Sequence, residues 1–149
     1  MKRMDQIKVS FTTRTKASSR PKITCSKSAA DLLFDIYDSE TIAMRESFYV
    51  IYLNRNNRVK GYHLHSIGGL DGCIVDIRII LATALKTLSS ALIISHNHPS
   101  TRLQPSQSDI KITNRLKKAA ELMDIKVLDH IIVSPERKYF SFADDGMLS

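Results

Sequence analysis

Cysteine, glycine and long apolar runs are all scarce in this chain. Its two cysteines, Cys25 and Cys73, lie far apart and form no C-x-x-C pair, so neither a disulfide framework nor a cysteine-based zinc knot is indicated. Five glycines in 149 residues, with no glycine-rich motif, argue against a loop that cradles nucleotide phosphates. No apolar run approaches the roughly 20 residues of a membrane helix, and the N-terminus lacks the apolar segment of a signal peptide. We therefore expect a cytoplasmic protein with reduced thiols and no membrane contact.

Positive charge is concentrated at one end of the chain. The formal net charge is +7, and residues 1–22 contain seven Lys/Arg against one acidic residue, so residues 23–149 are nearly neutral. A basic segment of this kind is usually solvated and mobile, although it can also make weak contacts with nucleic acid. We predict a basic, flexible tail over residues 1–22 and one domain over residues 23–149, because a chain that is 43% hydrophobic has the material for one core at this length.

The hydrophobic pattern of residues 23–149 alternates between strand and helix periods. Ser26 or Ser28 is expected to cap the first helix, and Asp76 a later one. This order of elements predicts a single α/β domain, three-layer-like, in which helices flank a mixed sheet. The predicted strands cover residues 46–54, 58–69, 91–95, 126–134 and 138–142, and the later helices cover 77–89 and 107–125.

Two histidines follow the buried strand over residues 91–95, and an acidic residue opens the next helix. His96 and His98 are two positions apart, so at a strand end their imidazoles point to the same side. The intervening loop is long enough to bring Asp109 back to them. Two imidazoles and one carboxylate make a three-ligand site for Zn²⁺ that leaves a fourth position for water, as in catalytic zinc sites. Such a water has a pKa of about 7 and can supply hydroxide at neutral pH.

Each of these residues also has a purely structural interpretation. A histidine near a strand end is commonly a hydrogen-bonded bystander. Ser106 and Asp109 have the spacing of an N-cap and of an acid favoured by the helix dipole. The two interpretations are compatible, because a capped Asp109 is a rigid ligand. His63 and His65 form a weaker ligand pair, and His130 is more typical of a core or supporting residue.

The segment HNHPSTRLQPSQSD, residues 96–109, resembles the metal-binding signature of the JAMM (MPN-plus, JAB) metallopeptidases, and its HNHPS…PS…D form is similar to that of the RadC proteins. The resemblance runs from about residue 24 to residue 149 and includes RESFYVIYLN, ALIIS and VLDHIIVS. It implies a cytidine-deaminase-like fold with His96, His98 and Asp109 as zinc ligands. It also implies that Ser106 forms a hydrogen bond near the metal-bound water or the developing oxyanion.

The family's catalytic glutamate, at the start of an early strand, falls on Glu46. Hydrolysis by metal-bound water needs a carboxylate that takes the proton of the water and delivers it to the leaving amine. Glu40 lies in a predicted turn, and Glu121 and Glu136 lie far along the chain. The alternative is that Glu46 is an ordinary solvent-facing acid at a strand edge.

The chain departs from the RadC pattern at Thr101, where glycine usually follows HNHPS. A β-branched residue disfavours positive φ, so the loop is expected to bend differently around the metal. Residues 1–22 do not resemble the helix-hairpin-helix region that longer RadC proteins carry ahead of this domain, so we expect no DNA role from these residues. The letters HNH at residues 96–98 do not indicate an HNH nuclease, whose motif is spread over a ββα unit.

We therefore expect a zinc-dependent hydrolase that cleaves a peptide or isopeptide bond in a protein or peptide substrate. The alternative is a non-enzymatic, zinc-bearing binding module, directed to nucleic acid or to a protein complex by the basic tail. A metal-free nucleic-acid-binding domain is disfavoured, because it would need a basic face that a nearly neutral domain does not indicate.

Overall fold

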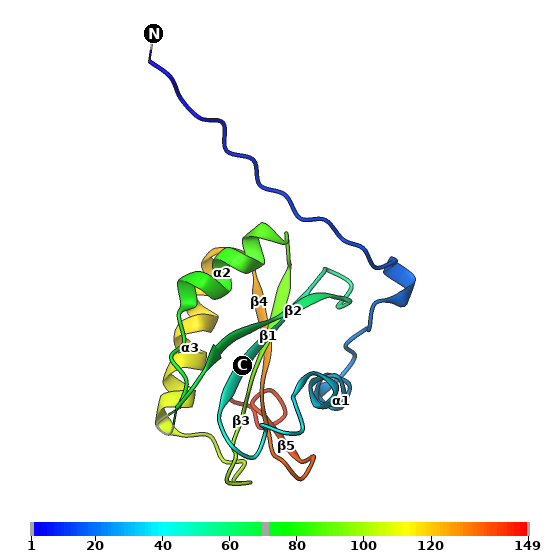
Figure 1. The fold of residues 1–149 in the computed structure, drawn as a ribbon, viewed down its shortest axis with the longest axis vertical. Helices are drawn as coiled ribbons and strands as arrows, with labels where there is room; N and C mark the ends of the chain where they lie inside the picture. The colour runs from blue at the N-terminus through cyan, green and yellow to red at the C-terminus, as the bar shows by residue number, and fades with distance from the viewer. Residues whose placement is uncertain (1, 70–71, 149) are drawn as a thin grey trace.

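The computed structural model describes residues 2–69 and 72–148, and these residues form one five-stranded sheet with helices on both faces (Figure 1). The strand order is β2-β1-β3-β4-β5; β3 and β4 run parallel, and every other neighbouring pair is antiparallel. The predicted α/β domain with a mixed sheet flanked by helices is confirmed. The elements are η1 (Ala17–Ser19), α1 (Ser26–Ile36), β1 (Ser47–Leu53), β2 (Val59–Ile67), α2 (Ile77–Lys86), β3 (Ala91–Asn97), α3 (Gln107–Leu122), β4 (Lys126–Val133) and β5 (Tyr139–Ser141).

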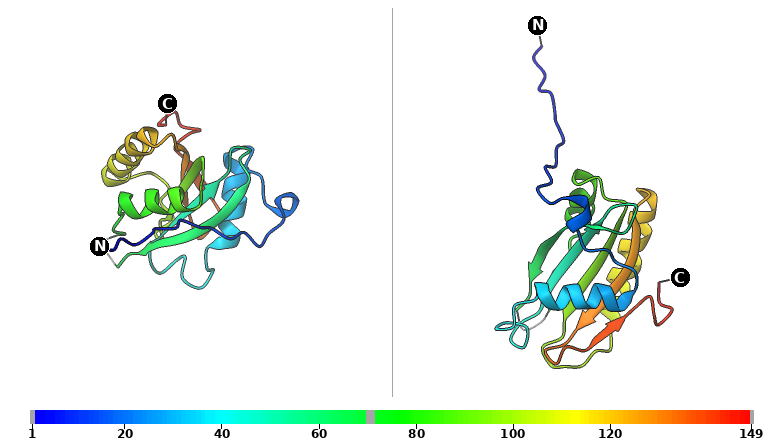
Figure 2. Two further views of the ribbon diagram at one scale, coloured as in Figure 1. Left: turned by 90° about the horizontal axis from the view of Figure 1, so that it is seen from above. Right: turned by 90° about the vertical axis from the view of Figure 1, so that its right-hand side faces the viewer.

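The sheet separates two apolar cores. Helix α1 covers one face, and α2 and α3 lie together on the other (Figure 2). Strands β1 and β3 are therefore buried on both faces, which explains why their sequences are nearly continuous apolar runs. The core under α1 contains Leu33, Ile51, Leu53, Ile93 and Ile131, and the core under α2 and α3 contains Phe48, Ile80, Leu92, Ile94 and Leu116.

The helix ends differ in detail from the prediction. The N-cap of α1 is Cys25, so neither Ser26 nor Ser28 is the cap; the Ser28 hydroxyl instead reaches back to accept the Cys25 N–H at 3.1 Å. Asp76 caps α2 as expected and accepts the Arg78 N–H at 3.0 Å. Helix α2 ends at Lys86, earlier than predicted, and Leu88 just beyond it has a φ of +52°, which a helix cannot continue through.

The register of the central strands brings distant residues to one end of the sheet. Strand β1 is antiparallel to β3 and pairs Phe48 with His96, so the residues just before β1 lie beside the residues just after β3. The β3–α3–β4 crossover that parallel pairing requires places the start of α3 at the same end. Residues near 46, 98 and 106 are thereby collected at the C-terminal end of β3.

The N-terminal segment extends away from the domain (Figure 1). Residues 2–19 are exposed, but the chain joins the domain at Pro21, whose carbonyl accepts the Val59 N–H at 2.8 Å. The Arg58 guanidinium also donates to the Arg20 carbonyl at 2.9 Å. Among the described residues, no helix combines the length and the apolar character that crossing a membrane would require.

Candidate metal centre

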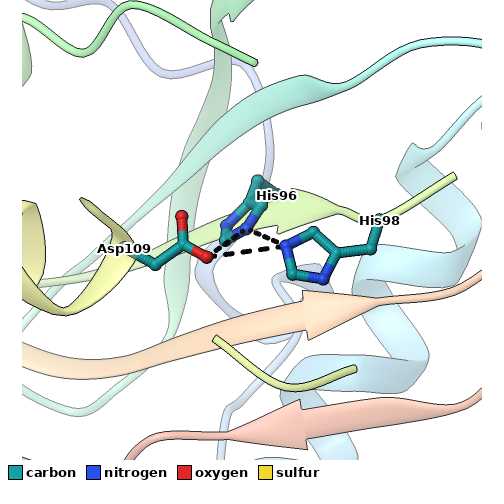
Figure 3. Close-up of side chains that lie close together, drawn as sticks. All are labelled: His96, His98 and Asp109. Carbon is teal, nitrogen blue, oxygen red and sulfur yellow. Dashed lines mark hydrogen bonds and ion pairs between the residues drawn. The ribbon is translucent and has the colours of Figure 1, made fainter. Parts of the chain in front are cut away.

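Three polar side chains converge where β3 ends and α3 begins (Figure 3). The Nε2 atoms of His96 and His98 are 2.8 Å apart, and Asp109 Oδ2 lies 3.3 Å from the first and 3.5 Å from the second. His96 is buried, and the other two are partly exposed. The structure thus brings together the three residues that the sequence predicts as ligands.

The start of α3 holds the carboxylate in place. Ser106 is the N-cap, and its hydroxyl accepts the Asp109 N–H at 3.1 Å, while its own N–H donates to Asp109 Oδ2 at 2.8 Å. This reciprocal pair is a capping box. The Asp109 oxygen that accepts the Ser106 N–H is also the oxygen that faces the histidines. The carboxylate that completes the capping box is therefore also the predicted metal ligand.

The spacing of the three atoms suits a tetrahedral cation. Zn²⁺ bonds of ~2.0–2.1 Å to nitrogen and oxygen imply ligand atoms about 3.3 Å from one another, close to the separations found here. Burial alone would raise the pKa of Asp109, but hydrogen bonds to His96 and His98 outweigh it and hold the pKa well below its ordinary value. Asp109 is therefore ionised at any pH at which the histidines could bind a metal.

The protons on the two imidazoles follow from their outer hydrogen bonds. His98 Nδ1 contacts the carbonyl of Arg102, which can only accept, so in the neutral ring Nδ1 carries the proton and Nε2 has a lone pair. His96 Nδ1 lies 2.8 Å from Nε2 of His130. His130 is fully buried, and its burial, followed by the charge of His96, lowers its pKa well below the ordinary value, so it is neutral.

Thr113 determines which nitrogen of His130 is protonated. Its hydroxyl lies 2.6 Å from the Asp109 carbonyl, to which it must donate, and 2.6 Å from His130 Nδ1. A hydroxyl has one proton, so His130 Nδ1–H donates to Thr113 and His130 Nε2 accepts from His96 Nδ1–H. His96 Nε2 is left with a lone pair.

Two lone pairs therefore face each other across 2.8 Å, with a carboxylate oxygen beside them. A cation between these atoms removes the repulsion, either a proton that makes one imidazole cationic or a metal ion. The donor set of two imidazole nitrogens and one carboxylate oxygen is suited to Zn²⁺. His130 was expected to be a supporting residue, and it contacts a predicted ligand; Thr113 was missed, because a buried threonine on a helix carries no sequence signal of this role.

Glu46 lies next to this cluster. It directly precedes β1, is partly buried, and borders two cavities: one of about 500 Å³ shared with His98 and Ser106, and one of about 180 Å³ shared with His96 and Asp109. Its carboxylate also approaches Gly72, where an added Cβ would lie 3.3 Å from Oε2. Glu46 therefore lies at the border of both cavities, where the resemblance predicts the general base.

Asn97, between the two histidines, holds the segment that carries Glu46. Its side chain is buried on the opposite face of β3 and accepts the Ser47 N–H at 2.7 Å. Its amide group donates to the carbonyls of Ile42 at 2.7 Å and Arg45 at 2.9 Å. Sequence analysis missed this residue, although its place inside the His-x-His pair was a signal. We call residues 42–47, which Asn97 holds, the base segment.

Thr101 has a φ of +70°, in the left-handed region that a β-branched residue disfavours and glycine adopts readily. Its N–H donates to the His98 carbonyl at 3.1 Å. The threonine therefore takes the unfavourable conformation here, and a different bend from that of a glycine-containing loop stays a prediction.

The remaining histidine pair does not form a site. His65 Nε2 accepts the Asp76 N–H at 2.9 Å, which occupies the lone pair that a metal would need. His63 is exposed. Within residues 2–69 and 72–148, His96, His98 and Asp109 form the one cluster whose ligand atoms lie close enough together to share a metal ion.

Comparison with known proteins agrees with this geometry. The family described as "RadC-like JAB domain" matches residues 23–147. A UPF0758 protein of Flavobacterium johnsoniae is 42% identical over 126 residues, which are 85% of this chain and 53% of that protein. A UPF0758 protein of Aquifex aeolicus is 38% identical over 130 residues, which are 87% of this chain and 54% of that protein. The chain thus spans about half the length of these relatives.

Proposed function

The chain belongs to the RadC-like JAB domain family, and from that premise we propose that it is a zinc-dependent hydrolase of peptide or isopeptide bonds. One observation carries the proposal: the ligand atoms of His96, His98 and Asp109 converge beside cavities that Glu46 also borders. A catalytic metal site needs this combination of three protein ligands, an open side and a nearby general base.

The roles of the side chains follow from their positions. Zn²⁺ held by His96, His98 and Asp109 would supply a Lewis acid and lower the pKa of its water to about 7. Glu46 takes the proton of the attacking water and delivers it to the leaving nitrogen. Ser106 accepts the Asp109 N–H with its oxygen, so its hydroxyl proton is available to donate to the developing oxyanion in the larger cavity, which it lines.

The competing function is a zinc-bearing binding module without catalysis. Metal content does not separate the two, because both need the same three ligands. Glu46 does, since a binding module has no need for a carboxylate that transfers protons.

The test compares Glu46→Gln with the parent after loading both with zinc and measuring bound metal. Each protein is incubated with a library of bacterial peptides, and new amino termini are counted by mass spectrometry. We expect the variant to keep its zinc and to lose cleavage by about 10²-fold or more, the usual size of a general-base contribution.

Glu40→Gln is the matched control, because it makes the same change at an exposed residue that borders neither cavity. It should cleave like the parent. Equal cleavage by Glu46→Gln and the parent would refute the mechanism, and zinc binding by a parent that cleaves nothing would favour the binding module.

A further inference from the structure

Two arginines line the larger cavity. In the sequence, one directly precedes Glu46 and the other follows His98. Arg45 lies in the base segment, and Arg102 lies in the loop between β3 and α3. We propose that Arg45 and Arg102 form a carboxylate-binding subsite, so that the substrate is a polypeptide with an acidic group next to the bond that is cleaved. The inference rests on the proposed function and adds the chemical class of the substrate.

The backbones of both arginines are attached to consecutive residues at the end of β3. The Arg45 carbonyl accepts from Asn97 Nδ2 at 2.9 Å, and the Arg102 carbonyl accepts from His98 Nδ1. Both side chains therefore start from points fixed relative to the metal centre. Two arginines whose backbones are held in this way present their guanidinium groups to a substrate from fixed starting points, whereas arginines on a mobile loop could only attract it.

Both arginines are exposed to solvent. Within residues 2–69 and 72–148, no carboxylate forms an ion pair with Arg45 or Arg102, although four other lysine or arginine side chains do form such pairs. The one acidic residue in the lining of the larger cavity is Glu46, which the proposed mechanism needs as a base. Two unpaired positive charges beside a cation site make this cavity favourable for an anion.

The shape of the cavity favours a peptide carboxylate over a nucleic-acid phosphate. Among the described residues its lining contains no Phe, Tyr or Trp, and its one aromatic ring is the imidazole of His98, a predicted metal ligand. The stacking surface that single-stranded nucleic acids use is therefore not provided. Met44, Pro99 and Pro105 provide apolar walls instead. A volume of about 500 Å³ is in the range of pockets that hold small ligands, and it suits a few peptide residues.

Binding without turnover tests this subsite. The zinc-loaded Glu46→Gln variant of the whole chain is titrated into fluorescent hexapeptides. The acidic peptides carry one glutamate, at a different position in each, and the neutral peptide carries glutamine at all these positions. Each peptide is made with a free and with an amidated C-terminus. Fluorescence anisotropy gives the affinities. We expect at least one acidic peptide to bind about tenfold more tightly than the neutral peptide, or a free C-terminus to bind about tenfold more tightly than an amidated one. This is the usual size of the contribution of a hydrogen bond to a charged group.

In the same background, Arg45→Gln and Arg102→Gln should each lose about tenfold in affinity for the preferred acidic peptide and bind the neutral peptide unchanged. Arg55→Gln is the control, because it removes the same charge from the turn between β1 and β2 at the opposite end of the sheet. The free and amidated termini show whether the carboxylate is a side chain or the end of a chain.

Equal affinity for acidic and neutral peptides, or equal losses in all three arginine variants, would overturn the proposal. If a ten-nucleotide oligothymidine binds more tightly than the peptides, and if the arginine variants weaken this binding, the ligand of the subsite is a nucleic acid and not a peptide. If the parent proves inactive but acidic peptides still bind through Arg45 and Arg102, the proposed hydrolase is wrong and the subsite stands.

Discussion

At the scale of single residues, the metal centre depends on where a few protons lie. The Asp109 carbonyl can only accept, so the Thr113 hydroxyl donates to it, and this fixes the protons on His130 and then on His96. The same threonine therefore contacts the backbone of one predicted ligand and, through His130, the ring of another. Supporting hydrogen bonds of this kind typically change metal affinity by about 10–100-fold.

Thr113→Val tests this chain of hydrogen bonds, because valine has nearly the same shape but no hydroxyl. We expect its zinc affinity, measured by competition with a chromophoric chelator, to fall about tenfold or more while the fold is retained. Thr113→Ser restores the hydroxyl and should bind zinc like the parent. Two-dimensional ¹H–¹⁵N NMR of the metal-free proteins should show His96 protonated at Nδ1 in the parent and in the serine variant. A valine variant with parental zinc affinity would contradict the role of Thr113.

Zinc binding should also depend on pH in a direction set by His98. Its burial lowers the pKa, but hydrogen bonds to Asp109 and the Arg102 carbonyl outweigh this and leave the pKa raised above 6.5. Zinc must displace the proton of the charged imidazole. The zinc affinity is therefore highest above the raised pKa and falls about tenfold per pH unit below it. Chelator competition between about pH 5.5 and 8.5 should therefore show the loss beginning above 6.5. A constant affinity down to 6.5 would exclude a raised pKa at His98.

At the scale of elements, β3 connects the two halves of the site. Its alternation directs His96 toward α2 and α3 and Asn97 toward α1. Hydrogen bonds of Asn97 then bind the base segment, which carries Glu46 and Arg45. The predicted ligands and the proposed general base therefore belong to different segments but share one strand as their support.

Asn97→Ala should separate these two functions. It leaves one N–H and two carbonyls without their partner, which costs about 1–3 kcal/mol for each group that stays buried. We expect zinc content to be retained and cleavage of a parental substrate to fall by about 10²-fold, because Glu46 loses its position. Ser95→Ala is the control: it removes a buried hydroxyl, 3.0 Å from the Tyr37 hydroxyl, on the same face of β3 as Asn97. Parallel losses of zinc and cleavage in Asn97→Ala would indicate a general structural defect.

The order of elements was predictable from the sequence, whereas the contacts around the site were only partly so. Strands buried on both faces and helices with one apolar side leave periodic patterns, and the His-x-His pair and the Ser106–Asp109 cap are local in sequence. The contacts of His130 with Thr113 and of Asn97 with Ile42 join residues 17 and 55 positions apart. Such contacts depend on strand register and crossover, which have no local pattern. The ends of α1 and α2 were misplaced because Cys25 is an unusual cap and Leu88 an unusual residue at positive φ.

At the scale of the whole molecule, the excess positive charge and the proposed metal centre lie in different parts of the chain. Residues 1–15 contain four of the seven basic residues of the tail, and all four are exposed: Lys2, Arg3, Lys8 and Arg14. Arg20 and Pro21, in contrast, are hydrogen-bonded to the turn between β1 and β2 and to β2. A truncation that tests the tail should therefore stop before residue 16.

Deletion of residues 1–15 removes the surface contact between the Phe11 ring and Lys60 Nζ, 5.6 Å from the ring centroid, but no backbone hydrogen bond of the sheet and no residue of the proposed metal centre. Folding and zinc content should therefore be unchanged. Any affinity for single-stranded DNA should fall and become less dependent on salt, by a slope of roughly 0.7 for each lost phosphate contact. Anisotropy titrations from about 50 to 200 mM salt measure both. A truncated protein with the full, salt-sensitive affinity would place the binding face on the domain.

The alternation of β3 has one further consequence, for how the protein is made. A slip of one residue in the pairing of β3 would turn His96 toward α1 and Asn97 toward the place of the ligand. The same error would bury polar groups against the wrong core and remove the metal centre. A newly synthesised chain with a misregistered sheet would lack the proposed zinc site, so binding of the ion would distinguish correctly assembled molecules from misregistered ones.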